Sequence, residues 1–154
     1  NLKLKNRSEA IKFAKPKTAQ EFYIRSLIMD VWEREQVISD LSKTIELDKE
    51  FAIAYLKRSG FLPFETRTKD LEEAIRLVPE WKEDKLYRHY FYEALDLSER
   101  RQYQSALPLL TKLIDNITDK YKLRRAYELR AKVYDKIGRT DLAQVDKLKA
   151  KQLK

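Results

Sequence analysis

Residues that could catalyse a reaction or hold a metal ion are scarce in this sequence of 154 residues. His89 is the single histidine and cysteine is absent, which excludes a histidine-based catalytic triad, a histidine-rich metal site and a cysteine-based zinc site. The two glycines, Gly60 and Gly138, stand far apart, whereas a phosphate-binding loop needs several glycines close together. We therefore predict no enzymatic activity, no metal site and no cofactor.

Carboxylates occur in adjacent pairs, such as Glu72 with Glu73 and Glu83 with Asp84. Two neighbouring residues of a helix point in different directions, so such a pair does not converge on one substrate atom as a general acid and base must. We interpret these pairs as solvated helix faces.

Aromatic side chains gather at Tyr87, Tyr90, Phe91 and Tyr92. On a basic protein such a run can stack the bases of single-stranded nucleic acid. The helical spacing favours a different role, because Tyr87, Tyr90 and Ala94 fall on one helix face. We interpret the run as packing between helices, and base stacking is the alternative.

The net charge of +8 is unevenly distributed. Residues 1–17 carry a net charge of +5, residues 18–118 carry −4 and residues 119–154 carry +7. The basic C-terminal end could meet phosphates or an acidic partner, or it could be the solvated outer face of a capping helix. The predicted basic patch consists of Arg124, Arg125, Lys147, Lys149 and Lys151.

The composition favours a protein made of helices, because charged residues make up 38% of the chain while glycine and proline number only two and four. No apolar run is long enough to span a membrane, and the basic N-terminal residues lack the apolar core of a signal peptide. The compartment is not set by the sequence, and a soluble cytoplasmic protein is the default expectation. Because the chain begins at Asn1 without a methionine, we expect it to be part of a longer protein.

Residues 126–150 contain the pattern that organises the chain. Tyr127, Ala131 and Tyr134 lie at steps of four and three, so they share one helix face. The small side chain of Ala131 allows a neighbouring helix to approach closely, with a tyrosine on either side of the contact. This order of a large, a small and a large residue therefore predicts a helix that packs tightly against another.

Local signals set the predicted helix boundaries. Gly138 stands where a glycine in the left-handed conformation commonly ends a helix, and Thr140 is the predicted N-cap of a helix over 140–153. Thr18 and Glu21 have the spacing of a capping box. The other predicted helices cover residues 1–15, 19–33, 35–47, 51–62, 66–78, 80–101 and 104–114, and a polar linker over 115–122 precedes the helix of the organising pattern.

The same order of residue sizes occurs four times along the chain. Its small residues are Ser26, Ser59, Ala94 and Ala131, at separations of 33, 35 and 37 residues. A second helix with matching apolar positions follows each of them. An arginine precedes three of the small residues, at Arg25, Arg58 and Arg130. Such a period indicates an array of helix pairs that bury their apolar faces against their neighbours.

The last repeat unit resembles the tetratricopeptide repeat (TPR) family, whose pattern is matched at Tyr127, Arg130, Ala131, Tyr134, Gly138, Ala143 and Ala150. Lys147 departs from it, because the family usually has a large apolar residue there. The resemblance implies an all-α stack of antiparallel helix pairs that forms a right-handed superhelix. It implies a single domain over 1–154, with repeat units at 18–49, 50–79, 80–117 and 123–154 and with residues 1–15 as the end of an upstream unit or a capping helix. The segment 81–85 is extra relative to the pattern.

In this family the first helices of the units line a concave groove that binds peptides or helices. The resemblance therefore implies a peptide groove lined by Tyr23, Leu27, Ile53, Leu56, Arg88, Phe91, Leu95, Arg125, Glu128 and Lys132. Such a groove would be apolar in its first half and basic at its C-terminal end, which suits a segment with an acidic tail. The asparagines with which some family members clamp a terminal carboxylate are absent from these positions.

Three functions remain open on this basis. The first is a non-catalytic protein–protein interaction scaffold that binds a peptide or helix segment of an unidentified partner. The second is binding of nucleic acid or an acidic partner through the basic N- and C-terminal helices. The third is a self-associating structural module, which would make the chain a homo-oligomer.

Overall fold

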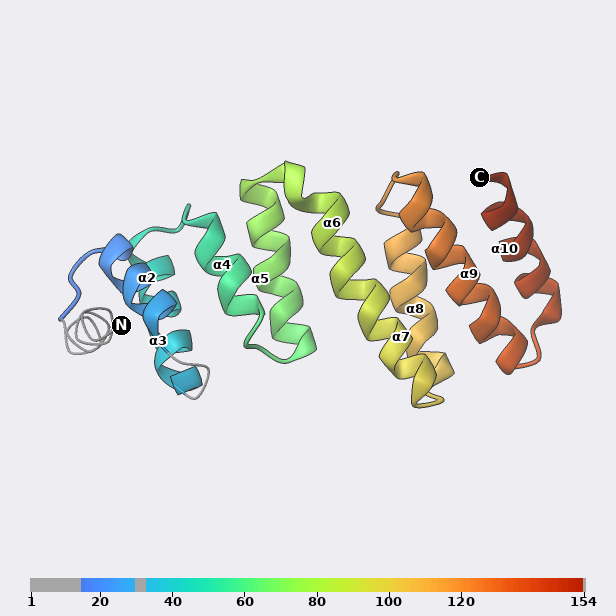
Figure 1. Cartoon of the computed structure of the whole chain (residues 1–154), viewed down its shortest axis with the longest axis horizontal. Helices are drawn as coiled ribbons and strands as arrows, with labels where there is room; N and C mark the ends of the chain where they lie inside the picture. Colours follow the sequence, from blue (N-terminus) through green and yellow to red (C-terminus); the bar gives the residue numbers. More distant parts are fainter. Residues whose placement is uncertain (1–14, 30–32, 154) are drawn as a thin grey trace, which may run out of the picture. The chain divides into compact units, whose positions relative to one another are not determined.

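The computed structural model describes residues 15–29 and 33–153, and all of its regular elements are helices (Figure 1), which confirms the all-α class. Apart from Lys15, the helix predicted over 1–15 lies outside the described residues. The chain divides into two compact units, Asn1–Pro79 (unit 1) and Glu80–Lys154 (unit 2). This boundary coincides with the predicted start of the third repeat unit at residue 80.

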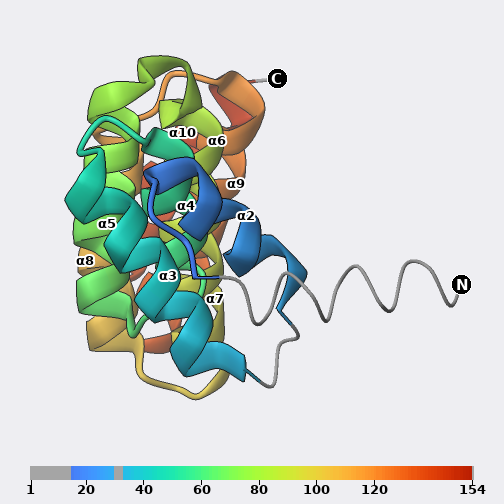
Figure 2. The same cartoon turned by 90° about the vertical axis from the view of Figure 1, so that its left-hand side faces the viewer.

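The described part of unit 1 contains two helix pairs. Helix α2 (Ala19–Ile28) packs against α3 (Arg34–Leu47), α4 (Ala52–Ser59) packs against α5 (Phe64–Leu77), and α3 also contacts α4 (Figure 1, Figure 2). Apolar residues of α3 and α4, surrounded by aromatic rings and a methionine, form the core: Val37, Leu41, Ile45, Ala54, Tyr23, Met29, Phe51, Tyr55 and Phe61.

From Pro79 onward the chain forms a nearly continuous helical run, which confirms the long helix predicted over 80–101. The run consists of η2 (Pro79–Trp81), α6 (Lys82–Leu86), η3 (Tyr87–Phe91) and α7 (Tyr92–Glu99). The segment η3 is π-helical, a wider turn that often occurs at functional sites and that the apolar periodicity does not indicate.

Three further helices complete unit 2. Helix α8 (Tyr103–Ile114) packs against η3 and α7, α9 (Lys120–Lys136) packs against α8, and α10 (Thr140–Gln152) packs against α9 (Figure 1). Unit 2 therefore holds the first and second helices of the third and fourth predicted repeat units.

Two predicted helix ends are confirmed. The Thr18 hydroxyl accepts a hydrogen bond from the Glu21 N–H at 3.3 Å, and the Glu21 carboxylate accepts one from the Thr18 N–H at 3.1 Å, which completes the capping box. Gly138 has φ of 77°, the left-handed conformation expected for a glycine that ends a helix.

One predicted helix start and one predicted N-cap are wrong. Helix α9 begins at Lys120 rather than at residue 123, because the Asp119 carboxylate accepts a hydrogen bond from the Lys122 N–H at 2.8 Å and caps the helix. Thr140 is the first residue of α10 and not its N-cap, which is Arg139. The helix predicted over 51–62 also ends earlier than expected, at Ser59.

The four small residues of the repeat pattern are all buried, as the pattern predicts. The two serines among them direct their hydroxyls inward without leaving them unsatisfied. The Ser26 hydroxyl donates to the Tyr23 carbonyl at 2.6 Å, and the Ser59 hydroxyl donates to the Leu56 carbonyl at 2.7 Å. Both serines can therefore occupy a helix contact that alanine occupies in the other two units.

In three repeat units the arginine before the small residue donates two hydrogen bonds to an aspartate of the following helix. The pairs are Arg25 with Asp40 (2.7 and 2.6 Å), Arg58 with Asp70 (2.8 and 2.7 Å) and Arg130 with Asp146 (2.7 and 2.9 Å). In the third unit Glu93 replaces the arginine, and Leu109 lies three residues after Ala106, as Asp146 lies three residues after Ala143. The arginine and the aspartate are therefore absent together.

Candidate functional site

The first helices of unit 2 bring a cluster of rings and arginines together at the surface. We call it the aromatic–arginine patch, and it consists of Tyr87, Phe91, Tyr92, Tyr121, Arg124 and Arg125. Tyr87 and Phe91 are four residues apart and therefore lie on the same side of the helical run, where they stack with their ring centroids 4.7 Å apart. Both are buried, with exposed fractions of 6% and 3%. They form the floor of the patch.

Two tyrosines project from this floor into solvent. Tyr92 is 55% exposed and meets the Phe91 ring edge-on at 5.6 Å, and Tyr121 is 57% exposed. The Arg124 and Arg125 guanidinium carbons lie 5.4 and 6.0 Å from the Tyr121 ring centroid. Exposed aromatic rings beside arginines are unusual on a surface that only needs to be soluble.

Arg125 links the two first helices of unit 2. Its guanidinium carbon lies 5.0 Å from the Phe91 ring centroid, so the cation covers the ring from the α9 side. Arg124 has a carboxylate nearby, Glu128 at 3.8 Å, whereas Arg125 forms no ion pair within the described residues. Arg125 is therefore a positioned cation whose charge no described carboxylate neutralises.

Two buried polar atoms of the patch have no hydrogen-bond partner among the described residues, Arg124 Nε and the oxygen of the Tyr87 hydroxyl. Burial raises the pKa of Tyr87, and the nearby charge of Arg125 opposes this rise. The phenol is thus neutral and keeps its O–H available close to the Arg125 cation.

The extra segment at 81–85 anchors the start of α9 beside the patch. Glu83 accepts hydrogen bonds from the Thr118 N–H and hydroxyl, both at 2.8 Å, and from the Asp119 N–H at 3.3 Å. Burial raises the pKa of Glu83, but these hydrogen bonds outweigh it and the pKa is lowered overall. Asp84 lies 3.9 Å from Lys122 and adds a weaker contact.

The predicted groove residues have different environments in the two units. In unit 1, Leu27 is 48% exposed, whereas Tyr23, Ile53 and Leu56 are partly buried. In unit 2, Arg88, Glu128 and Lys132 are exposed, and Leu95 and Arg125 are partly buried. Phe91 differs from the expectation, because its ring is buried under Arg125 and stacked on Tyr87 and is therefore not free to meet a ligand.

The predicted basic patch is only partly available. Lys147 forms an ion pair with Asp135 at 2.8 Å, and the Lys149 ammonium lies 5.4 Å from the Tyr127 ring centroid. Lys151 is exposed near the end of α10. Because these lysines are partly engaged within the α9–α10 pair, Arg124 and Arg125 stand out as the basic residues that lie beside exposed rings.

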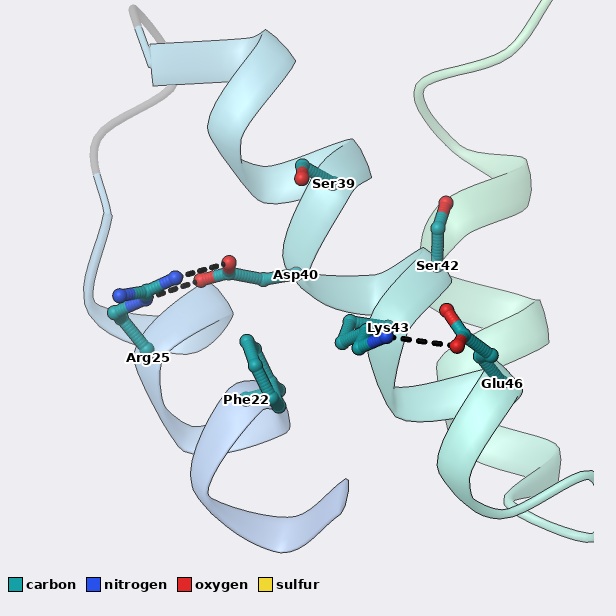
Figure 3. A pocket seen from close by; sticks show the side chains of 7 residues that line it. All are labelled: Phe22, Arg25, Ser39, Asp40, Ser42, Lys43 and Glu46. Atoms are coloured by element: carbon teal, nitrogen blue, oxygen red, sulfur yellow. Dashed lines mark hydrogen bonds and ion pairs between the residues drawn. The ribbon is translucent and has the colours of Figure 1, made fainter. Parts of the chain in front are cut away.

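A hollow lies in unit 1 between α2 and α3. It has a volume of about 410 Å³ and is lined by Phe22, Arg25, Ser39, Asp40, Ser42, Lys43 and Glu46 (Figure 3). Figure 3 shows its charges already paired, Arg25 with Asp40 and Lys43 with Glu46 at 2.7 Å. The Ser42 hydroxyl also accepts a hydrogen bond from Arg58 at 3.0 Å. Since its polar groups satisfy one another, this hollow offers a ligand less than the patch does.

The described parts of the chain contain neither a cluster of potential metal ligands nor a candidate membrane-spanning helix. No group of three or more potential ligands gathers around one point there, and no helix there is long and apolar enough to cross a membrane.

Tyr87, Tyr90 and Phe91 are buried, which agrees with the packing role predicted for the aromatic run, whereas Tyr92 faces solvent.

Sequence reasoning missed one residue of the aromatic–arginine patch and the aspartates that pair with the repeated arginines. It did not identify Tyr121 as a site residue, because Tyr121 falls in the segment predicted as a linker. It also did not predict Asp40, Asp70 and Asp146 as partners of the repeated arginines. The recurrence of an aspartate 12 to 16 residues after each arginine is a signal that could have revealed these pairs.

Comparisons with known proteins identify the fold. No protein-family model and no curated protein matches the chain. Two crystal structures of MamA match it at 21% identity, with TM-scores of 0.58 and 0.57. Each match covers 95% of this chain, and they cover 84% and 78% of the respective MamA chains. MamA is TPR-like, so this chain has a TPR-like helical repeat fold.

Proposed function

We propose that this chain is a non-catalytic protein–protein interaction scaffold that binds a peptide or helix segment of another protein. We place the contact surface on the first helices of unit 2, centred on the aromatic–arginine patch. The observation that carries the proposal is the pair of tyrosines, Tyr92 and Tyr121, each more than half exposed beside Arg124 and Arg125. Tyrosine and arginine are enriched among the residues that dominate binding energy at protein interfaces.

The geometry of the patch supports this role. A buried floor of stacked rings holds the exposed residues in place, so little side-chain entropy is lost when a partner binds. The hydrogen bonds of Glu83 fix the start of α9, and with it Tyr121, Arg124 and Arg125. The neighbouring predicted groove residues Arg88, Leu95, Glu128 and Lys132 would extend the contact along the same helices.

Single-stranded nucleic acid is the second candidate ligand, because exposed tyrosines beside arginines can stack bases and the chain carries a net charge of +8. The two candidates differ in their response to salt. Binding to nucleic acid should weaken steeply as salt increases, whereas binding to a protein segment should weaken less.

The test is affinity capture from cell lysate treated with nuclease, using the wild type, the double variant Tyr92→Ala/Tyr121→Ala and the control Leu148→Ala. Leu148 is 51% exposed on α10 of the same unit but lies outside the patch. We expect defined proteins that the wild type and the control retain and that the double variant loses, with about tenfold weaker binding in a titration of the purified partner.

Circular dichroism must show that the double variant remains folded. If the double variant retains the same proteins, the patch is not the contact surface. If all captured proteins disappear with nuclease, nucleic acid is the favoured ligand. Sedimentation over a range of concentrations tests the third alternative, self-association.

A further inference from the structure

Three arginines of this chain share one arrangement. Each lies over an aromatic ring, with its guanidinium carbon 5.6 Å from Phe22 for Arg25, 5.9 Å from Tyr55 for Arg58, and 5.6 and 5.8 Å from Tyr127 and Tyr134 for Arg130. Each also holds an aspartate carboxylate through two hydrogen bonds of 2.6 to 2.9 Å. A guanidinium packed against a ring keeps the N–H groups at its edge available, which explains why the two contacts occur together.

Arg125 also packs on aromatic rings, but it lacks the aspartate partner of the other three arginines. Its guanidinium carbon lies 5.0 Å from the Phe91 ring and 6.0 Å from the Tyr121 ring, yet no carboxylate pairs with it within the described residues. It is only partly buried, so an external group can reach it. Comparison with Arg25, Arg58 and Arg130 therefore indicates that a carboxylate is the partner that Arg125 lacks.

The Tyr87 hydroxyl provides an independent indication at the same place. The residue is 6% exposed, its oxygen has no hydrogen-bond partner among the described residues, and it lies close enough to Arg125 to interact with its charge. An unpaired buried hydroxyl is costly, and an acceptor brought by a ligand would relieve that cost.

We propose that Arg125 binds a side-chain carboxylate of an acidic partner segment, an Asp or Glu flanked by apolar residues that contact Tyr92 and Tyr121. This inference rests on the proposed scaffold function and specifies the chemistry of its partner.

The surroundings favour a carboxylate on a protein over a phosphate backbone. Asp84 and Glu128 lie beside the cations Lys122 and Arg124, which leaves Arg125 as the patch cation without a carboxylate among the described residues. One such cation suits a single acidic group better than a run of phosphates. Tyr87 and Phe91 are buried, so only Tyr92 and Tyr121 of the patch could stack a base.

The experiment uses the full chain and an array of short synthetic peptides. Each peptide with a central Asp or Glu flanked by apolar residues is matched by the same peptide with Asn or Gln at that position. Wild type is compared with Arg125→Gln, with Arg125→Lys and with the control Arg101→Gln, which removes a charge from an exposed turn residue two positions after the end of α7. Affinities of the best peptide pairs are then measured by titration.

We expect the wild type and Arg101→Gln to prefer the acidic peptides by about tenfold or more, because a charge-assisted bidentate pair is among the strongest hydrogen-bonding contacts. Arg125→Gln should bind both members of a pair equally. Arg125→Lys should lose most of the preference, because lysine keeps the charge without the planar fork. Melting curves establish that each variant is folded.

Two results would overturn the inference in different ways. Peptide binding without a preference for the acid removes the role of Arg125 and leaves the scaffold function standing. An absence of binding to any peptide, together with binding of a single-stranded oligonucleotide that Arg125→Gln abolishes, removes both proposals and assigns the patch to nucleic acid.

Discussion

The repeated arginine–aspartate pairs join helices at points where the repeat pattern alone predicts only apolar contact. Arg130 and Asp146 are largely buried, with side-chain exposures of 12% and 3%, and Arg130 also donates to the Thr111 hydroxyl at 3.0 Å. One arginine thereby connects α8, α9 and α10. The hydrogen bond to Asp146 raises the pKa of Arg130, so the arginine stays charged throughout the ordinary pH range.

The pair should therefore act as a unit. We expect Asp146→Leu to destabilise the chain by about 3–5 kcal/mol, because it leaves a buried guanidinium without its carboxylate. The double variant Arg130→Met/Asp146→Leu should lower the free energy of unfolding much less. The third repeat unit, which has neither the arginine nor the aspartate, supports this expectation. Urea unfolding measures both, and the exposed Asp141→Ala is the control, expected to change the stability little. Equal costs for the single and double variants would contradict this coupling.

Glu83 gives the stability of unit 2 a pH dependence. Its folded pKa is lowered, since the hydrogen bonds from Thr118 and Asp119 outweigh the effect of burial. A lowered folded pKa contributes stability that is present above the unfolded value, about 4.3, and is lost as pH falls through the folded pKa. Glu83→Gln should therefore lower the urea midpoint at neutral pH, and its difference from the wild type should shrink below pH of about 4. A difference that is independent of pH would show that the carboxylate charge is not responsible.

At the scale of single elements, we expect replacement of the two glycines by alanine to have different effects on stability. Gly138 has φ of 77°, and a Cβ added there would meet no atom within 4 Å. Gly138→Ala should therefore cost about 1–2 kcal/mol through backbone strain alone. Gly60 has an ordinary φ of −63°, so Gly60→Ala should be neutral or stabilise by up to about 1 kcal/mol. Thermal unfolding of both variants tests this, and destabilisation of similar size at both positions would contradict it.

The helical run over 79–99 shows how one element prepares the site. Tyr87 stacks on Phe91 within η3, Tyr92 directly after it faces solvent, and Glu83 one turn earlier holds the start of α9. A regular helix would keep Tyr87 and Phe91 on one face, but it would rotate Tyr92 and the residues after it about the helix axis relative to them. The extra residues of the third repeat unit thus supply both the floor and the anchor of the aromatic–arginine patch.

At the scale of the whole molecule, the division into two compact units predicts independent folding. Unit 2 has its own core, to which α8 and α9 contribute residues such as Leu110, Leu113 and Val133. We expect a fragment of residues 80–154 to be helical and to unfold cooperatively in urea, because repeat proteins are stabilised mainly by contacts between adjacent repeats. Circular dichroism of the fragment measures this. A disordered fragment would show that unit 2 depends on residues of unit 1.

The sequence by itself determined the helical repeat. Its evidence was local: the spacing of large and small residues, the capping box at Thr18 and Glu21, and the glycine at 138. Each of these acts within a few residues or within one helix, so its consequence can be predicted without knowing how the helices cross. The exclusion of histidine-triad and cysteine chemistry likewise followed from composition.

Only the tertiary structure decided which side chains meet. Phe91 was predicted to line the groove, but Arg125 from another helix covers its ring, and no local pattern contains that contact. No local pattern contains the contact of Tyr121 with the arginines or the pairing of the aspartates with the repeated arginines. Nor does any local pattern show that Arg125 has no such carboxylate partner within the described residues. These features depend on the distance and rotation between packed helices, which side-chain volumes across several elements set together.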